Sequence, residues 1–336
     1  MTTSAEQAEA AQAGAPQTGS RRVPDFFVAG HTKCGTTAMY AMLRRHPQIY
    51  MPSLKEPRWF ASDLRYSNPA QRGNRLPQSY EEYLALFAQA QPDQLAGEAS
   101  PMYLWSRDAA ANIAAVAPRA RIIAILREPA SFLYSLHNHW VLHHVEAEQD
   151  FAKAILLEQA RREGRQVPGP SYWPQALLYS DHVRYVEQLR RYEAVLGREQ
   201  ILVLIYDDYR RDNEAAVRQV LRFLEVDDQA PVQVMEANTT RKRLRARRLD
   251  AVGRQLYTGT GPVAKAARTG LKALMSERVR TQVLPAMRRR MVYAEVQRLD
   301  EGYALELRRR FKGEVVALSE HLNRDLVAEW GYDGLG

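Results

Sequence analysis

Residues 30–37 combine glycines, a lysine and hydroxyl side chains at a spacing that suits the binding of an anion. Gly30 and Gly35 permit close approach of the backbone to a ligand, Lys33 adds a mobile cation, and Thr36 and Thr37 add hydroxyl donors. The complete stretch is Gly30, His31, Thr32, Lys33, Cys34, Gly35, Thr36 and Thr37. We interpret it as a loop that binds a phosphate or a sulfate.

The segments on either side of this loop predict how it is positioned. Residues 26–29 are continuously apolar, as in a strand buried on both faces, and residues 38–46 have the apolar spacing of a helix. A strand that leads into a helix in this way aims free backbone N–H groups and the positive end of the helix dipole at one point. The alternative is a tight strand-to-helix turn with a solvated lysine.

The position of the lysine separates this loop from the ordinary nucleotide-binding P-loop. That loop places lysine directly after its second glycine. Here the equivalent position holds Thr36, and Lys33 lies two residues before Gly35. The stretch is therefore not a Walker A loop.

A second candidate anion site follows a predicted strand at residues 120–126. The strand ends in Arg127, and residues 131–144 have a helical pattern that carries Ser135. Arginine offers a planar fork that fits phosphate, and serine offers a hydroxyl donor. We expect Arg127 and Ser135 to converge on one anion at the carboxyl edge of the sheet, where open α/β sheets bind ligands.

Two groups of side chains are candidates for a general base. Glu56 lies between Lys55 and Pro57; partial burial would raise its pKa while the lysine lowers it. An ordinary surface ion pair is the alternative. Histidines 137, 139, 143 and 144 lie on the helix at 131–144, and His139 and His143 have a zinc-like spacing. Because no His-Glu-x-x-His motif is present, we interpret these histidines as part of the wall of an aromatic-lined cleft.

The order of the predicted elements indicates an α/β fold. Strands alternate with helices, which favours a mainly parallel central sheet flanked by helices in a three-layer sandwich. Residues 97–105 are interpreted as a polar turn that leads into aromatic residues. The expected strands are 26–29, 49–51, 120–126 and 201–206, and the expected helices are 38–46, 80–90, 107–116, 131–144, 181–196 and 213–224.

Composition indicates the structural class of the protein and its cellular compartment. The chain has 336 residues, 46% of them apolar, and one cysteine, Cys34, so no intramolecular disulfide can form. Residues 1–22 are rich in small polar residues and predict a disordered tail, which leaves 23–336 as a single domain. With no pattern of a secretory signal or of a membrane span, we expect a soluble, cytoplasmic protein.

The positive charge is concentrated near the C-terminus. The formal net charge is +8, and residues 241–312 hold 20 Lys and Arg against 6 Asp and Glu in a largely helical pattern. Such a region could contact nucleic acid, an anionic membrane or an anionic ligand. Residues 263–274 could lie on a membrane surface. Core packing with a cationic outer face is the interpretation we favour over that peripheral contact, and we expect no nucleic-acid partner.

Several separated motifs together resemble the sulfotransferases that use 3'-phosphoadenylyl sulfate (PAPS), nearer to their bacterial and carbohydrate-modifying branches. Residues 30–37 match the 5'-phosphosulfate loop, and Arg127 with Ser135 matches the 3'-phosphate site. Residues 55–57 align with the segment that carries a catalytic glutamate, and residues 98–103 resemble a Glu-Lys-(Ser/Thr)-Pro-x-Tyr turn. The segment 308–330 resembles the family's closing helix. The resemblance covers roughly residues 23–336.

This resemblance implies a P-loop-like sulfotransferase fold and in-line transfer of a sulfuryl group from PAPS to a hydroxyl. It leaves adenosine 3',5'-bisphosphate (PAP) as product and requires no metal. Lys33 would stabilise the leaving group and Glu56 would take the hydroxyl proton, with His137 or His139 as the alternative base. The chain departs from the family at Ala99, where a lysine is common, and at Phe132, where an arginine is common.

Two other functions remain as alternatives. A phosphoryl-transferring kinase would need a magnesium-binding carboxylate, for which Asp207 and Asp208 are the nearest match, together with a Walker lysine. A non-enzymatic module could bind polyanions through the basic C-terminal half. The acceptor of a sulfotransferase is left open among a small molecule, a sugar and a lipid-linked natural product, and the sequence indicates no oligomeric state.

Overall fold

The computed structural model describes residues 22–64, 76–168, 173–235, 242–244, 293–295 and 298–335. Its centre is a five-stranded sheet with the order β2-β3-β1-β4-β5, in which every neighbouring pair is parallel. The strands are β1 (Phe26–Val28), β2 (Ile49–Tyr50), β3 (Leu95–Ala99), β4 (Arg121–Leu126) and β5 (Ile201–Ile205). The predicted α/β fold with a parallel sheet is confirmed.

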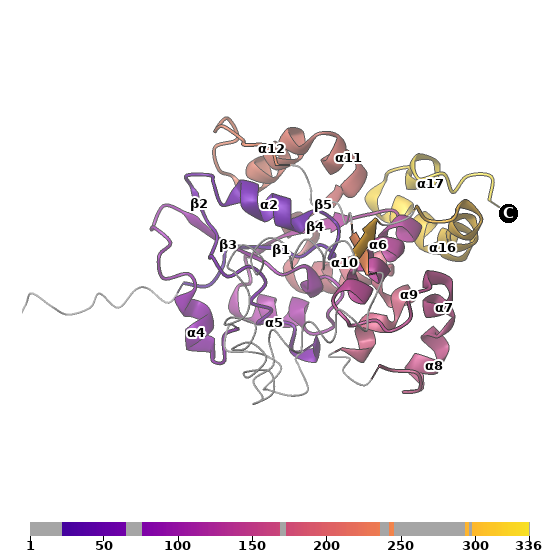
Figure 1. The fold of residues 1–336 in the computed structure, drawn as a ribbon. Coiled ribbons are helices and arrows are strands. Elements are labelled where there is room, and N and C mark those ends of the chain that lie inside the picture. Colours follow the sequence, from indigo (N-terminus) through magenta and orange to yellow (C-terminus); the bar gives the residue numbers. More distant parts are fainter. Residues whose placement is uncertain are drawn as a thin grey trace, which may run out of the picture.

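Helices cover both faces of this sheet. Figure 1 shows α2 and α12 on one face and α5 on the other, where α10 packs against α5. The longer helices are α2 (Thr36–Leu43), α5 (Ala109–Val116), α6 (Pro129–Leu142), α10 (Tyr185–Leu196), α12 (Asn213–Leu224) and α16 (Glu301–Leu322). The shorter helices are α4 (Tyr80–Ala85), α7 (Phe151–Leu156), α8 (Glu158–Arg162), α9 (Tyr179–His182), α11 (Tyr206–Arg211) and α17 (Leu326–Glu329).

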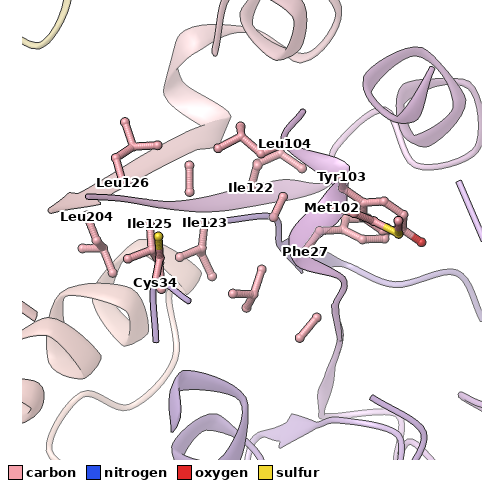
Figure 2. Close-up of a cluster of buried hydrophobic side chains, with 14 of the residues drawn as sticks. Phe27, Cys34, Met102, Tyr103, Leu104, Ile122, Ile123, Ile125, Leu126 and Leu204 are labelled. Atoms are coloured by element: carbon pink, nitrogen blue, oxygen red, sulfur yellow. The ribbon is translucent and has the colours of Figure 1, made fainter. Parts of the chain in front are cut away.

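Strand β4 lies inside the core between β1 and β5. Its side chains alternate between the two faces: Ile123 and Ile125 point to the side of Cys34, whereas Leu126 points to the opposite side, where Leu104 lies (Figure 2). All of these side chains are fully buried. A strand buried on both faces must be apolar along its whole length, which explains the continuous apolar run that predicted it.

Strand β3 was missed in the sequence because its composition is atypical. Residues 97–99 were interpreted as part of a turn, but they pair with Phe26, Phe27 and Val28 of β1. Glycine and glutamate are disfavoured in strands. Gly97 is required here because a Cβ atom would lie 2.1 Å from the ring of Phe26. Close packing of an aromatic ring over the strand therefore replaces the usual β-forming residue.

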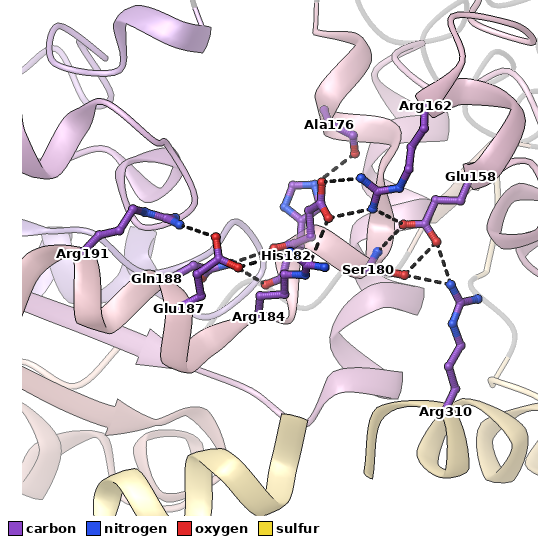
Figure 3. Close-up of polar contacts among 11 residues, drawn as sticks. Glu158, Arg162, Ala176, Ser180, His182, Arg184, Glu187, Gln188, Arg191 and Arg310 are labelled. Carbon is purple, nitrogen blue, oxygen red and sulfur yellow. Dashed lines mark hydrogen bonds and ion pairs between the residues drawn. The ribbon is translucent and has the colours of Figure 1, made fainter. Parts of the chain in front are cut away.

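The C-terminal helices pack on the same core. Leu307, Phe311, Val315 and Leu318 form the buried face of α16, which lies against α6 and α10. Arg310 of this helix reaches Glu158 of α8 at 2.9 Å and the Ser180 hydroxyl of α9 at 2.8 Å (Figure 3). These contacts tie the end of the chain to the helices that follow α6.

Several predictions lie wholly or partly outside the described residues. The expected tail at 1–22 is described only at Arg22, and the surface segment at 263–274 is not described. From the basic region at 241–312, the structure gives an antiparallel pair, β6 (Lys242–Leu244) with β7 (Tyr293–Glu295), and the start of α16. Among the described helices, none has both the length and the apolar character needed to cross a membrane.

Candidate active site

The predicted anion loop connects β1 to α2, and glycine is needed at two of its positions. A Cβ on Gly30 would lie 2.9 Å from the backbone nitrogen of Ile125. Gly35 has a φ of +85°, and a Cβ there would lie 2.4 Å from the ring of Tyr209. Gly35 is followed directly by α2, whose N-terminus has no side-chain cap. The first N–H groups of α2 therefore remain available to a ligand.

A cavity of about 460 Å³ lies at this helix end. Thr32, Lys33, Gly35, Thr36 and Thr37 line it from the loop and the first turn of α2. Other walls come from the segment after β2, from α6 and from the residues before α9. The carboxyl ends of the parallel strands thus meet at a pocket that opens onto backbone N–H groups.

Lys33 lines this pocket, whereas Arg127 and Ser135 do not, although Arg127 contacts the backbone of Lys33. A terminal nitrogen of Arg127 donates to the carbonyl oxygen of Lys33 at 3.3 Å. Burial, followed by the Arg127 charge, lowers the pKa of Lys33. Neither side chain forms an ion pair with a carboxylate of any described residue. Two partly buried cations without an anionic partner favour the binding of an anionic ligand.

Arg127 is positioned by contacts that the sequence did not reveal. Its Nε donates to the Ser131 hydroxyl at 3.1 Å, and its guanidinium lies 4.8 Å from the ring centre of Tyr206. Ser135 lies four residues after Ser131 and His139 four residues after Ser135, so all three share one face of α6. The predicted Ser135 thus lies between the arginine contact and the cavity wall.

His31 of the anion loop is held by a buried hydrogen-bond network. The His31 Nε2 is 2.8 Å from Oε1 of Gln188, and the Gln188 amide nitrogen donates to the carbonyls of Asp181 and His182. Figure 3 shows Gln188 beside His182. Because the N–H groups of Gln188 donate to these carbonyls, its Oε1 must accept from the Nε2–H of His31. Burial lowers the pKa of His31 to about 3, so the ring stays neutral.

His31 and Cys34 are therefore buried residues that support the loop from the protein interior. Cys34 is fully buried, and burial raises the pKa of its thiol to about 12. Such a thiol is a poor nucleophile, so we assign Cys34 the role of a buried spacer. Gly30, His31 and Cys34 shape the loop but do not line the cavity, in contrast to Lys33, Gly35 and the three threonines.

Glu56 and Arg58 also line the cavity. The Lys55 ammonium lies 2.5 Å from one Glu56 oxygen and an Arg58 nitrogen lies 2.8 Å from the other. Burial raises the pKa of Glu56, but these two cations outweigh it and hold the value at about 2. Arg58 also lies 5.1 Å from the ring centre of Trp173. The predicted base is thus ionised and inside the pocket.

The structure separates the candidate histidines. His139 and His143 line the cavity, with ring centres 4.3 Å apart, and burial followed by the neighbouring His143 lowers the pKa of His139 to about 3. His137 lies on another side of α6, where its Nε2 contacts the carbonyl of Glu148 and its ring packs on Phe151. Only His139, of the two histidines considered as a base, faces the site.

The carboxylates required by the kinase alternative are arranged differently. Asp208 lies in α11 and is held by Arg324 at 2.6 Å. In the described part of the chain, no three His, Cys, Asp or Glu side chains come together as a group that could hold a metal ion. Asp208 therefore ties α11 to the C-terminal segment.

A family model described as a sulfotransferase domain matches residues 23–255. The chain belongs to the sulfotransferase family. The resemblance inferred from the separated motifs is thereby confirmed, and the match includes the anion loop, Glu56, Arg127 and Ser135. The kinase and the non-enzymatic polyanion-binding module lose support, since neither predicts this match.

Two curated sulfotransferases share about a quarter of their aligned residues with this chain. Carbohydrate sulfotransferase 15 of Mus musculus is 25% identical over 250 residues, which cover 61% of this chain and 44% of that protein. Bifunctional heparan sulfate N-deacetylase/N-sulfotransferase 4 of Mus musculus is 27% identical over 214 residues, which cover 61% and 22%. The match therefore spans less than half the length of these curated relatives.

A solved structure supports the fold over nearly the whole chain. A sulfotransferase from Alicyclobacillus acidocaldarius aligns with a TM-score of 0.63 and 23% sequence identity, covering 92% of this chain and 99% of that one. At this identity the likeness concerns the fold. It extends past residue 255, where the family model ends.

Proposed function

We propose that the protein transfers a sulfuryl group from PAPS to a hydroxyl of a sugar, a small molecule or a lipid-linked acceptor. One observation carries the proposal: Lys33 and Arg127 lie together beside the uncapped N-terminus of α2, without a carboxylate partner among the described residues. Two cations and a helix N-terminus fit a donor with phosphates at both its 3' and 5' positions.

The residues of the donor end divide between the two phosphates. The first N–H groups of α2, with the hydroxyls of Thr36 and Thr37, would hold the 5'-phosphate. Arg127, with Ser135 on the adjoining face of α6, would hold the 3'-phosphate and so distinguish PAPS from ADP-like nucleotides. Lys33 would stabilise the negative charge that develops on the bridging oxygen as the S–O bond breaks. The donor supplies the activated sulfuryl group.

Glu56 is our proposed base for the acceptor hydroxyl, and His139 is the alternative. Both groups line the cavity, and both are deprotonated at neutral pH because their pKa values are lowered to about 2 and about 3. Because they line the same cavity as the anion loop, an acceptor bound there would lie within reach of both the base and the donor. His137, the other histidine considered for this role, lies outside the cavity lining.

The acceptor class rests on the aromatic side of the cavity. Trp140 and Trp173 lie on its wall together with Arg58. Aromatic faces beside polar side chains fit the apolar face and the hydroxyls of a sugar ring. Relatives named as carbohydrate sulfotransferases support the same class.

Calorimetry with PAP and ADP tests the donor assignment. We expect PAP to bind at least about tenfold more tightly than ADP, because a hydrogen bond to a charged group contributes about 1.5–3 kcal/mol. Arg127→Gln should bring the affinity for PAP close to that for ADP. The matched control is Arg121→Gln on the same strand, where the arginine pairs with Glu225. Equal binding of PAP and ADP by the wild type would refute the proposal.

A further inference from the structure

The segment that carries Glu56 and Arg58 has an unfavourable backbone conformation. Glu56 has a φ of 61° and Arg58 a φ of 59°, in the left-handed region that side chains other than glycine rarely adopt. Residues in such conformations cost about 1–3 kcal/mol each and persist only where the surroundings hold them. Specific contacts must therefore hold residues 56–60 in place.

Three backbone N–H groups of this segment are bonded to residues 99–103. The N–H of Glu56 donates to the carbonyl of Ala99 at 3.2 Å. The N–H of Arg58 donates to the Ser100 hydroxyl at 3.1 Å, and the N–H of Phe60 donates to the Tyr103 hydroxyl at 3.2 Å. Two of the three acceptors are thus hydroxyl groups, which rotate freely unless their own protons are engaged.

Glu98 engages the proton of one of these hydroxyls. The Tyr103 hydroxyl donates to Oε2 of Glu98 at 2.9 Å. With its proton directed to Glu98, this hydroxyl presents a lone pair to the N–H of Phe60. Glu98 therefore acts on the segment of the cavity wall through Tyr103, although it does not line the cavity.

The carboxylate of Glu98 is unusual because it is buried. Glu98 is fully buried and forms no ion pair with a described cation, but the Tyr83 hydroxyl also donates to its Oε2, at 2.7 Å. Burial raises the pKa of Glu98 to about 7, while Ser100, Tyr83 and Tyr103 act to lower it and the nearby Glu56 charge raises it further. The second oxygen, Oε1, has no hydrogen-bond partner among the described residues, so both tyrosine hydroxyls share the single oxygen Oε2.

We propose that Glu98 is a positioning residue for sulfuryl transfer, which helps to fix Glu56 and Arg58 by orienting the hydroxyl of Tyr103 toward the N–H of Phe60. This inference rests on the proposed function, because it assigns Glu98 a role through the proposed base. An apolar side chain at position 98 would leave the Tyr103 hydroxyl undirected. Residues 56–60 would then relax from their left-handed conformation, and Glu56 would leave its place on the cavity wall.

The test compares four variants at pH 8, where Glu98 is ionised. Glu98→Met keeps the length of the side chain but removes its acceptor oxygens. Tyr103→Phe removes the hydroxyl that links Glu98 to the N–H of Phe60, and Ser100→Ala removes the acceptor of the Arg58 N–H. Tyr83→Phe is the matched control, because it also removes a hydroxyl donor to Glu98 but no acceptor of residues 56–60. The readouts are kcat with PAPS and an acceptor chosen from a panel of phenols and oligosaccharides, the Kd for PAP, and hydrogen exchange of residues 56–60.

We expect Glu98→Met to lower kcat roughly 10–100-fold, since displacement of a catalytic group by about 1 Å can cost about 10²-fold. Tyr103→Phe and Ser100→Ala should each lower kcat up to about tenfold, the size of one hydrogen bond. All three should speed exchange at residues 56–60 and leave the Kd for PAP within about twofold, while Tyr83→Phe changes kcat and exchange little.

Two results would overturn the inference. One is wild-type kcat and wild-type exchange at residues 56–60 in Glu98→Met. The other is a loss in Tyr83→Phe as large as that in Tyr103→Phe, which would indicate general loosening of the core. Wild-type protein that transfers no sulfuryl group to any acceptor would count against the proposed function instead, and the exchange measurement would still decide whether Glu98 holds the segment.

Discussion

The two ends of the cavity are built in different ways. At the donor end, Lys33 lies in the loop that connects β1 to α2, Arg127 follows β4 directly, and the N–H groups belong to the first turn of α2. At the acceptor end, Glu56 lies on a segment without regular structure, which depends on hydrogen bonds to residues 99–103. At the donor end, Lys33 and Arg127 have no carboxylate partner among the described residues. At the acceptor end, Lys55 and Arg58 both pair with Glu56.

This difference indicates how each end responds to change. The backbone of the sheet fixes the donor end, so a single substitution there should remove a contact and leave the geometry intact. Side-chain hydrogen bonds fix the acceptor end, so a substitution behind the cavity wall should move the proposed base. Precision at the acceptor end therefore depends on residues that touch no substrate.

Removal of the base should have the largest effect. Glu56→Gln is expected to lower kcat about 10²–10⁴-fold, because general base catalysis typically contributes that much. His139→Gln is the comparison, since both side chains line the cavity. Steady-state kinetics with PAPS decides between them. A greater loss in His139→Gln, with Glu56→Gln within a few-fold of wild type, would move the role of base to the histidine.

Removal of the Lys33 charge at the donor end should have the next largest effect. Lys33→Ala should lower kcat roughly 10²–10³-fold, the usual cost of losing one group that stabilises developing charge. Lys153→Ala on α7 deletes the same charge at an exposed position and should change little. Hydrogen exchange at residues 56–60 should stay at the wild-type level in both variants. Faster exchange there in Lys33→Ala would contradict the separation of the two ends.

The smallest expected effect is on stability in acid. The pKa of Glu56 is lowered from 4.5 to about 2, so its ionised form stabilises the folded state above pH 4.5. This contribution is lost as the pH falls from about 4.5 toward 2. The difference in the free energy of unfolding between wild type and Glu56→Gln should therefore shrink over that range in urea unfolding. A difference that does not change with pH would show that the ion pairs add no net stability.

The sequence predicted the donor end better than the acceptor end for a physical reason. Continuous apolar runs reveal strands buried on both faces, and a glycine-rich loop or an arginine at the end of such a run is then placed by the fold. Lys33, Thr36, Thr37 and Arg127 were found in this way, and the structure brings them to one edge of the sheet.

The residues that the sequence did not reveal are those defined by contacts between distant segments. Gln188 holds His31 across 157 positions, and nothing in its local pattern indicates this role. The same is true of the contact between Arg58 and Ser100. The motif at residues 98–103 attracted attention through its resemblance, but its place in a strand and its link to residues 56–60 depend on the packing of Phe26 over Gly97.

The cap of α6 shows in what order this site can form as the protein is made. Glu128, next to Arg127, accepts from the backbone N–H groups of Ala130 and Ser131 and from the hydroxyl of Tyr332, which lies 204 positions further along the chain. All five strands of the sheet precede residue 206. A growing polypeptide can therefore complete its sheet on the ribosome long before the tyrosine is added. Full affinity for the donor should appear only late in synthesis.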